Sequence, residues 1–198
     1  MLTTFSDIFV RQYDESIGIS SLNYISLAVG FTLGGQVGGR LTDRFYRQLK
    51  EKHGGKGRPE FKLPLMMITA FLIPVGFLLF GWTAEYKVHW IVPNIGAVIF
   101  SLGLMGVWMG IQMYSVDSFG VFAASAASAI TIVRSLCGFG FPLFATSLYE
   151  RLGYGWGNSV IALVLVVIGI PVPFLLWHCG PWLRSKSSYA VKPIAPSK

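Results

Sequence analysis

The chain has 198 residues, of which 53% are hydrophobic and only 13% charged, and its formal net charge is +7. A soluble domain carries about 25% charged residues, so this composition excludes an ordinary soluble enzyme or binding domain. The uncharged residues are also grouped into five long windows, and each window is long enough as a helix to cross the roughly 30 Å hydrocarbon core of a bilayer. The windows are residues 16–39, 63–84, 88–116, 118–150 (interrupted by Arg134 and ending at Glu150) and 152–183.

We therefore predict an all-α integral membrane protein. In chain order, residues 1–16 are expected to form the end of a preceding helix and an outer loop. Five predicted spans follow, with a basic loop over 40–63 after the first of them and a tail over 179–198 after the last. The predicted spans are 17–39, 64–82, 90–113, 119–148 and 158–178. Five spans and a fraction suit one half of a larger bundle better than a complete one.

The distribution of basic residues predicts the orientation of these spans. Half of the 16 Lys and Arg lie in the loop 40–62, and the tail carries several more. The positive-inside rule places both segments in the cytoplasm, and we expect the membrane to be the plasma membrane. Trp82, Trp90, Trp156, Tyr86 and Tyr154 lie at the opposite boundary, as an aromatic belt would. The basic loop is thus an orientation signal, and the net charge does not indicate nucleic-acid binding.

The start of the basic loop, GRLTDRFYR, contains a candidate gating motif. Gly39 would let the chain turn, and Asp43 could accept hydrogen bonds from the N-terminus of a neighbouring helix. Arg40, Arg44 and Arg47 could pair with that carboxylate or with lipid phosphates. A contact that forms and breaks as helices move suits a gate; the alternative is an ordinary cluster of charges beside the membrane.

This motif resembles the G-x-L-x-D-R-x-G-R-K signature of the major facilitator superfamily, although Tyr46 and Gln48 replace the family's second Gly and its Lys. Downstream, YSVDSF (114–119), AASA (123–126), RS (134–135) and GFGFPLF (138–144) resemble helices 10 to 12 of the fungal drug:proton antiporters, which are multidrug and polyamine exporters. The resemblance implies the C-terminal helical bundle, about five to six transmembrane helices, of a major facilitator fold. Its implied partners are a small-molecule substrate, protons, the lipid bilayer and a missing N-terminal six-helix half.

Arg134 is the most specific candidate for a transport residue. It lies near the middle of the span 119–148, where an Arg costs roughly 2.5–3.5 kcal/mol to insert, so we expect it to face a cavity or a partner. The alternative is a purely structural ion pair or a contact with backbone carbonyls. Asp117, at the start of the same predicted span, is interpreted as a helix N-cap or as a gate acid near the basic loop.

Further polar groups in or near the spans could line the substrate or proton pathway, or could be interhelical hydrogen bonds and boundary anchors. These are Asn23, Tyr24, Gln112 and Tyr114. Gly30, Gly34 and Gly38 share one helical face, and Gly106 and Gly110 share another, which predicts close helix approach. Pro171 and Pro173 are expected to bend or end the last span.

The leading functional prediction is part of a proton-coupled exporter of drug-like compounds or polyamines that works by alternating access and is incomplete alone. An uptake transporter of the same fold and a non-transporting truncated or regulatory membrane fragment remain alternatives. No enzyme, cofactor or metal site is predicted. His53, His89 and His178 are scattered, and the glycines at 54, 55 and 57 lack the strand and spacing of a phosphate-binding loop.

Overall fold

The computed structural model describes residues 5–13, 16–52, 58–187 and 189. Parts of the predicted outer segment, basic loop and tail lie outside the described residues, as do His53 and the glycines at 54, 55 and 57. Every element in the described ranges is helical, which confirms the predicted all-α class. In order, the elements are α1 (Phe5–Tyr13), α2 (Ile17–Leu22), α3 (Tyr24–Lys52), η1 (Pro59–Lys62), α4 (Leu63–Glu85), α5 (Ile91–Phe119), η2 (Gly120–Phe122), α6 (Ala123–Val164), η3 (Leu165–Gly169) and α7 (Pro171–Lys186).

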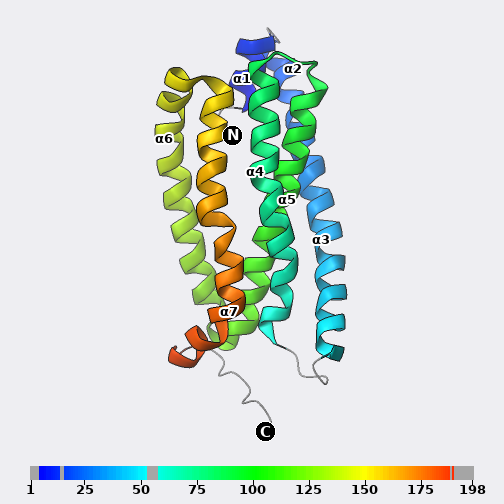
Figure 1. Ribbon diagram of the computed structural model, residues 1–198, viewed down its shortest axis with the longest axis vertical. Coiled ribbons are helices and arrows are strands. Elements are labelled where there is room, and N and C mark those ends of the chain that lie inside the picture. Colours follow the sequence, from blue (N-terminus) through cyan, green and yellow to red (C-terminus); the bar gives the residue numbers. More distant parts are fainter. Residues whose placement is uncertain (1–4, 14–15, 53–57, 188, 190–198) are drawn as a thin grey trace.

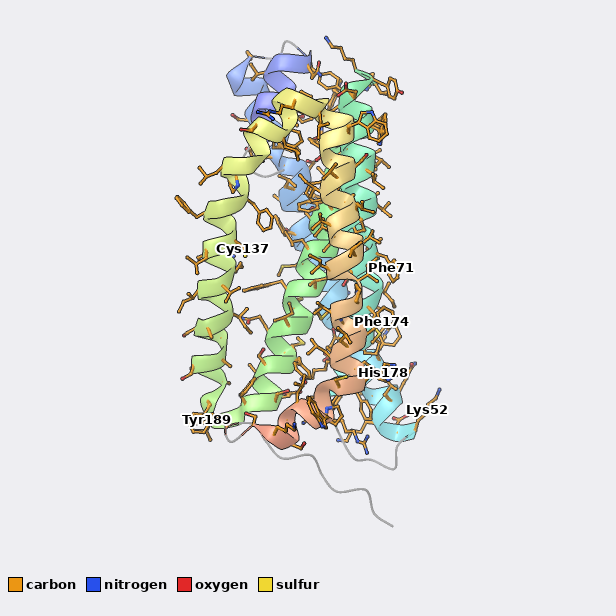
Figure 2. All side chains as sticks on the ribbon, turned by 60° about the vertical axis from the view of Figure 1, so that its left-hand side comes forward. Lys52, Phe71, Cys137, Phe174, His178 and Tyr189 are labelled. Atoms are coloured by element: carbon orange, nitrogen blue, oxygen red, sulfur yellow. The ribbon has the colours of Figure 1, made fainter. Side chains whose placement is uncertain are left out.

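The long helices run side by side as an elongated bundle (Figure 1). Lys52, His178 and Tyr189 lie near one end of the bundle (Figure 2). This end also carries η1 and the C-terminal end of α7, whose last turns contain Lys62, Arg184 and Lys186, and we call it the basic end. We call the other end, where α1 and α2 lie, the far end (Figure 1). Three helical stretches are long and apolar enough to cross a membrane, Pro59–Glu85, Ile91–Tyr149 and Arg151–Lys186, and the second of these contains both α5 and part of α6.

α3 differs from its predicted span at both ends. The helix is interrupted at Asn23, between α2 and α3, whereas one continuous helix was predicted from 17 to 39. At the other end the helix continues past Gly39 to Lys52. Residues 40–52 contain no Gly or Pro and are rich in Arg, Leu, Gln and Lys, which favour helix, so nothing in this segment stops the helix at the membrane boundary.

α6 consists of two limbs. Gly153 has φ +75° and ψ 176°, which are not helical values, and it divides a first limb (123–152) from a second limb (154–164). In Figure 1 both limbs extend from this bend at the far end toward the opposite end of the bundle, side by side and antiparallel. The predicted connection between the fourth and fifth spans, 149–157, contains this break. A carboxylate stabilises it, since Glu85 Oε2 accepts from the backbone N–H groups of Tyr154, at 2.8 Å, and Gly155, at 3.2 Å.

A π-helical turn and Ile170 separate the second limb from α7, which begins at Pro171. η3 is a π-helical turn, and its Ile170 N–H donates to the Leu165 carbonyl at 3.2 Å, five residues back. The wider turn precedes Pro171, whose ring in a regular α-helix would clash with the carbonyl four residues earlier. The regular α-helix thus stops before Pro171 and starts again at it, as predicted for Pro171, whereas Pro173 lies inside the first turn of α7.

Glycines hold α3, α4 and α5 close together, as the small-residue faces predicted. A Cβ on Gly30 would lie 1.9 Å from Ser101 Oγ and 2.7 Å from the Val98 carbonyl oxygen of α5. On the other side of α5, a Cβ on Gly106 would lie 2.4 Å from Thr69 Cγ2 of α4. These three helices therefore form a tightly packed block, because the only atoms at these contacts are backbone and small side chains.

The apolar core lies toward the far end of this block, where α1 is inserted. Phe5, Ile8 and Phe9 are fully buried among residues of α4 and α5. The Phe5 ring stacks on Phe80 with centroids 5.4 Å apart. The predicted aromatic belt also forms a contact here, because the Trp82 and Trp156 rings meet edge to face at 5.7 Å.

Candidate functional site

A cavity of about 540 Å³ lies between α5 and the first limb of α6. α5 contributes Leu104, Val107, Trp108 and Ile111 to its wall. The first limb contributes Ala129, Ile130, Val133 and Arg134. Ligand pockets in proteins commonly measure about 300–1,000 Å³ and are mostly apolar, so the volume and the apolar lining of this open cavity fall within the range of such pockets.

Arg134 is the single charged residue in this wall. It lies about 16 Å along the helix from Ala123, at roughly 1.5 Å per residue, which is a little over a third of the way along the first limb and near the middle of the predicted span 119–148. Its guanidinium carbon lies over the Trp108 ring, 4.9 Å from the centroid. Within the described part of the chain, Arg134 makes no ion pair or hydrogen bond. The predicted alternative of a structural ion pair is therefore not formed between described residues, and the cation–π contact is its interaction here.

Asp117 does not begin the helix after it. It lies in the last turn of α5, and α6 starts at Ala123 with Phe122 as its N-cap residue, so the N-cap interpretation is wrong. The Asp117 carboxylate instead pairs with Lys62 Nζ at 2.7 Å. The helix boundary was misplaced because apolar periodicity fixes helix ends only to within a few residues.

The Lys62–Asp117 pair also connects to α3. Lys62 Nζ lies over the Tyr46 ring at 5.5 Å from its centroid, and Tyr46 packs against Phe61 with centroids 6.4 Å apart. Tyr46 is the residue that replaces a Gly of the family signature. Its ring therefore has a structural role that a Gly could not perform: it links the extension of α3 to η1, and through Lys62 to α5.

A second ion pair at the basic end was not predicted. Glu60 of η1 and Arg184 of α7 form a hydrogen-bonded salt bridge, and both side chains are more than nine-tenths buried. Only Arg184 Nη2 and Glu60 Oε1 meet; Arg184 Nε and Glu60 Oε2 are buried without a hydrogen-bond partner among the described groups. The sequence signal was an acid directly before an apolar span and an Arg at the edge of another, but 124 residues separate the two.

Tyr114 lies beside this pair. A Cβ on Gly180 would lie 2.9 Å from the Tyr114 hydroxyl oxygen and 3.4 Å from Glu60 Oε1, so the glycine leaves room for both groups. The sequence named Tyr114 as a pathway candidate, and the structure places it at the basic end with Glu60 and Arg184. We call Glu60, Lys62, Tyr114, Asp117 and Arg184 the basic-end cluster.

The gating-motif residues lie along the extension of α3. Arg40, Asp43, Arg44 and Arg47 are exposed, and a Cβ on Gly39 would meet nothing within 4 Å. The turn expected at Gly39 is absent, because the helix continues. The described residues place no neighbouring helix N-terminus against Asp43, and the four charged side chains are open to an external partner.

The remaining candidates are dispersed. Asn23 is buried at the far end, and its Oδ1 accepts from Asn94 Nδ2 at 2.9 Å. Tyr24 is 39% exposed, and its ring contacts Phe5 at 5.1 Å. Gln112 is half-buried in α5, and its Oε1 is buried without a hydrogen-bond partner in the described residues. The structure thus separates the predicted residues into the cavity with Arg134, the basic-end cluster and contacts at the far end, and leaves Gln112 and the gating motif outside these groups.

Comparison with known proteins identifies relatives along nearly the whole chain. It is 46% identical to the efflux pump vrtL of Penicillium aethiopicum over 190 residues, 96% of this chain and 38% of the relative. It is 46% identical to the MFS-type transporter oryF of Aspergillus oryzae, over 94% of this chain and 39% of the relative. It is 40% identical to the probable efflux pump mfs2 of Aspergillus flavus, over 95% of this chain and 45% of the relative.

No family model matches the chain, and no solved structure matches it. The chain spans about 40% of the length of the curated relatives that it matches. The sequence identity to transporters, the apolar helical stretches and the succession of motifs all indicate the same family. The chain therefore belongs to the MFS-type transporters, the major facilitator superfamily, and corresponds to the C-terminal half of their fold.

Proposed function

We propose that this chain forms one half of a proton-coupled secondary transporter that exports small drug-like compounds or polyamines by alternating access. The observation that carries the proposal is the cavity beside Arg134, a mid-depth apolar site with a single charge. In transporters built from two repeats, the substrate site lies near the bilayer midplane between the halves. The relatives named efflux pumps support export over uptake.

The basic-end cluster has the properties of a gate. The Lys62–Asp117 pair is partly exposed, with side-chain accessibilities of 21% and 31%, so water can replace either partner at low cost. The Glu60–Arg184 pair is buried and holds η1 against α7. We propose that the first pair opens during the cycle, while the second keeps its end of the half assembled. Asp43 and the arginines of the motif would contact the other half.

The proposed location is the plasma membrane, with the basic end in the cytoplasm. Arg58, Lys62, Arg184 and Lys186 lie in η1, beside it or in the last turn of α7, and the positive-inside rule supports a cytoplasmic position for such a group. Cysteines introduced at Lys52 and Tyr189 should react with membrane-impermeant maleimide only after intact cells are opened. Labelling from outside intact cells would indicate the opposite orientation.

The transport proposal is tested by joining this chain to the remaining portion of a relative, such as the vrtL efflux pump. Cells expressing the chain alone should export no fluorescent drug, whereas cells expressing the joined protein should export it until a protonophore dissipates the proton gradient. Substrate accumulation by the joined protein would indicate an uptake transporter. Neither export nor accumulation would indicate a non-transporting membrane fragment.

A further inference from the structure

The charge of the cavity beside Arg134 restricts the substrates that it can hold. Its surface is almost wholly apolar, Arg134 is the one charged residue among those that line it, and no acidic residue does. A polyamine or lipophilic cation placed there would be repelled by the like charge of Arg134. A molecule with an apolar body and a negative group would pair with Arg134 and cover the apolar wall.

Arg134 is also arranged to accept such a partner. The π-face of the Trp108 ring attracts the guanidinium, whose carbon lies 4.9 Å from the ring centroid. This contact leaves the N–H groups along the edge of the guanidinium free to donate to another acceptor. The guanidinium has five N–H donors in a planar fork, and no described residue accepts from them. A carboxylate is the group that matches this fork in a bidentate geometry.

The packing of the first limb makes the site accessible. Every described side chain from Ala123 to Leu148 is exposed or half-buried, so this limb lies at the edge of the bundle, as the position of Cys137 also shows (Figure 2). A charged side chain at mid-depth that faced lipid would be costly, and such residues face a cavity or the interior of an assembly. The face of the first limb that carries Arg134 is therefore the face that lines the cavity.

From these contacts we infer that the cavity between α5 and α6 binds a lipophilic organic anion, with its carboxylate on Arg134 beside Trp108 and its apolar body against Leu104, Val107 and Ile130. The inference rests on the proposed transport function and narrows it, because it excludes polyamines from this site. Acid-bearing aromatic or polycyclic compounds are the class of substrate that fits.

Binding is tested on the purified full chain in detergent with three pyrene probes that share one apolar body: 1-pyrenebutyrate, its neutral amide and the cationic 1-pyrenebutylamine. Energy transfer from tryptophan to pyrene reports binding. The anion should bind at least about tenfold more tightly than the amide, a ratio that corresponds to about 1.4 kcal/mol. The amine should bind most weakly, and spermidine should not displace the anion.

Arg134→Gln should remove the preference for the anion, Arg134→Lys should retain part of it, and Arg151→Gln serves as the matched control. Arg151 is exposed on the same helix near the Gly153 bend and does not line the cavity. Equal binding of anion and amide by the unaltered chain would overturn the inference without any variant. So would an anion preference that Arg134→Gln leaves unchanged.

Export is measured separately on the joined protein, so that failure of the site and failure of the proposed function give different results. Anion binding by the joined protein without any export would refute the transporter and leave the site intact. Export of the amine or of spermidine with no anion preference would refute the site and leave the transporter intact. Loss of the anion preference when the second half is joined would assign Arg134 to a carboxylate of that half and overturn the inference.

Discussion

The buried pair of Glu60 and Arg184 gives the strongest test of how the basic end is held together. Both side chains are under 10% accessible, and removing one partner of a buried pair leaves a charge without compensation, which costs about 3–5 kcal/mol. Only one of the two possible N–H to oxygen bonds is formed, and Arg184 Nε and Glu60 Oε2 have no partner among the described groups. We therefore expect the lower value, about 3 kcal/mol, for Glu60→Gln or Arg184→Met.

The double variant Glu60→Gln/Arg184→Met should be more stable than either single one, because it buries no unpaired charge. The assay is unfolding of the purified chain in mixed micelles with increasing dodecyl sulfate, followed by tryptophan emission. Arg58→Met is the matched control, since Arg58 is exposed at the start of η1 and should change stability by no more than about 0.5 kcal/mol. Single variants as mild as this control, or a double variant equal to the sum of the singles, would refute the reasoning.

Three further predictions concern packing, the gate and transport. Gly30→Ala should cost about 1–3 kcal/mol in the same unfolding assay, because its Cβ would lie 2.7 Å from a backbone oxygen of α5, whereas Gly138→Ala, with nothing within 4 Å, should be neutral or slightly stabilising. Asp117→Asn should change stability by less than about 1 kcal/mol but alter the export rate of the joined protein, and exchanging the charges of Lys62 and Asp117 should restore that rate. Arg134→Ala should abolish export by the joined protein at unchanged membrane abundance; undiminished export would remove Arg134 from the pathway.

The formation of long apolar helices could be predicted because a bilayer requires long uncharged windows, and the sequence shows these directly. The close contacts of α3, α4 and α5 were also predictable, since glycines at every fourth residue present one face with no side chain. The end of α3 could not be predicted, because a membrane boundary and the end of a helix depend on different features of the sequence. A membrane boundary requires charge, whereas a helix ends where a breaker or a cap stops it.

The candidate site was predicted in part for the same kind of reason. Arg134 could be identified because a charge inside an apolar window is costly wherever the helix packs. The partners of Asp117 and Glu60 depend on which helix ends meet at the basic end, and no local pattern specifies that arrangement. Trp108 could not be assigned to Arg134 for the same reason, because the contact joins two helices whose relative rotation only the packed structure defines.

The bend at Gly153 separates a loosely packed limb of α6 from the closely packed remainder of this half. Close contacts at glycines hold α5 against α3 on one side and α4 on the other. The first limb of α6, in contrast, buries none of its described side chains between Ala123 and Leu148. The limb is attached at its ends, by the turn at Gly120 and by the bend at Gly153, both with positive φ. A small rotation of this limb about its own axis would move Arg134 across the face of Trp108 without changing the glycine contacts that hold α3, α4 and α5 together.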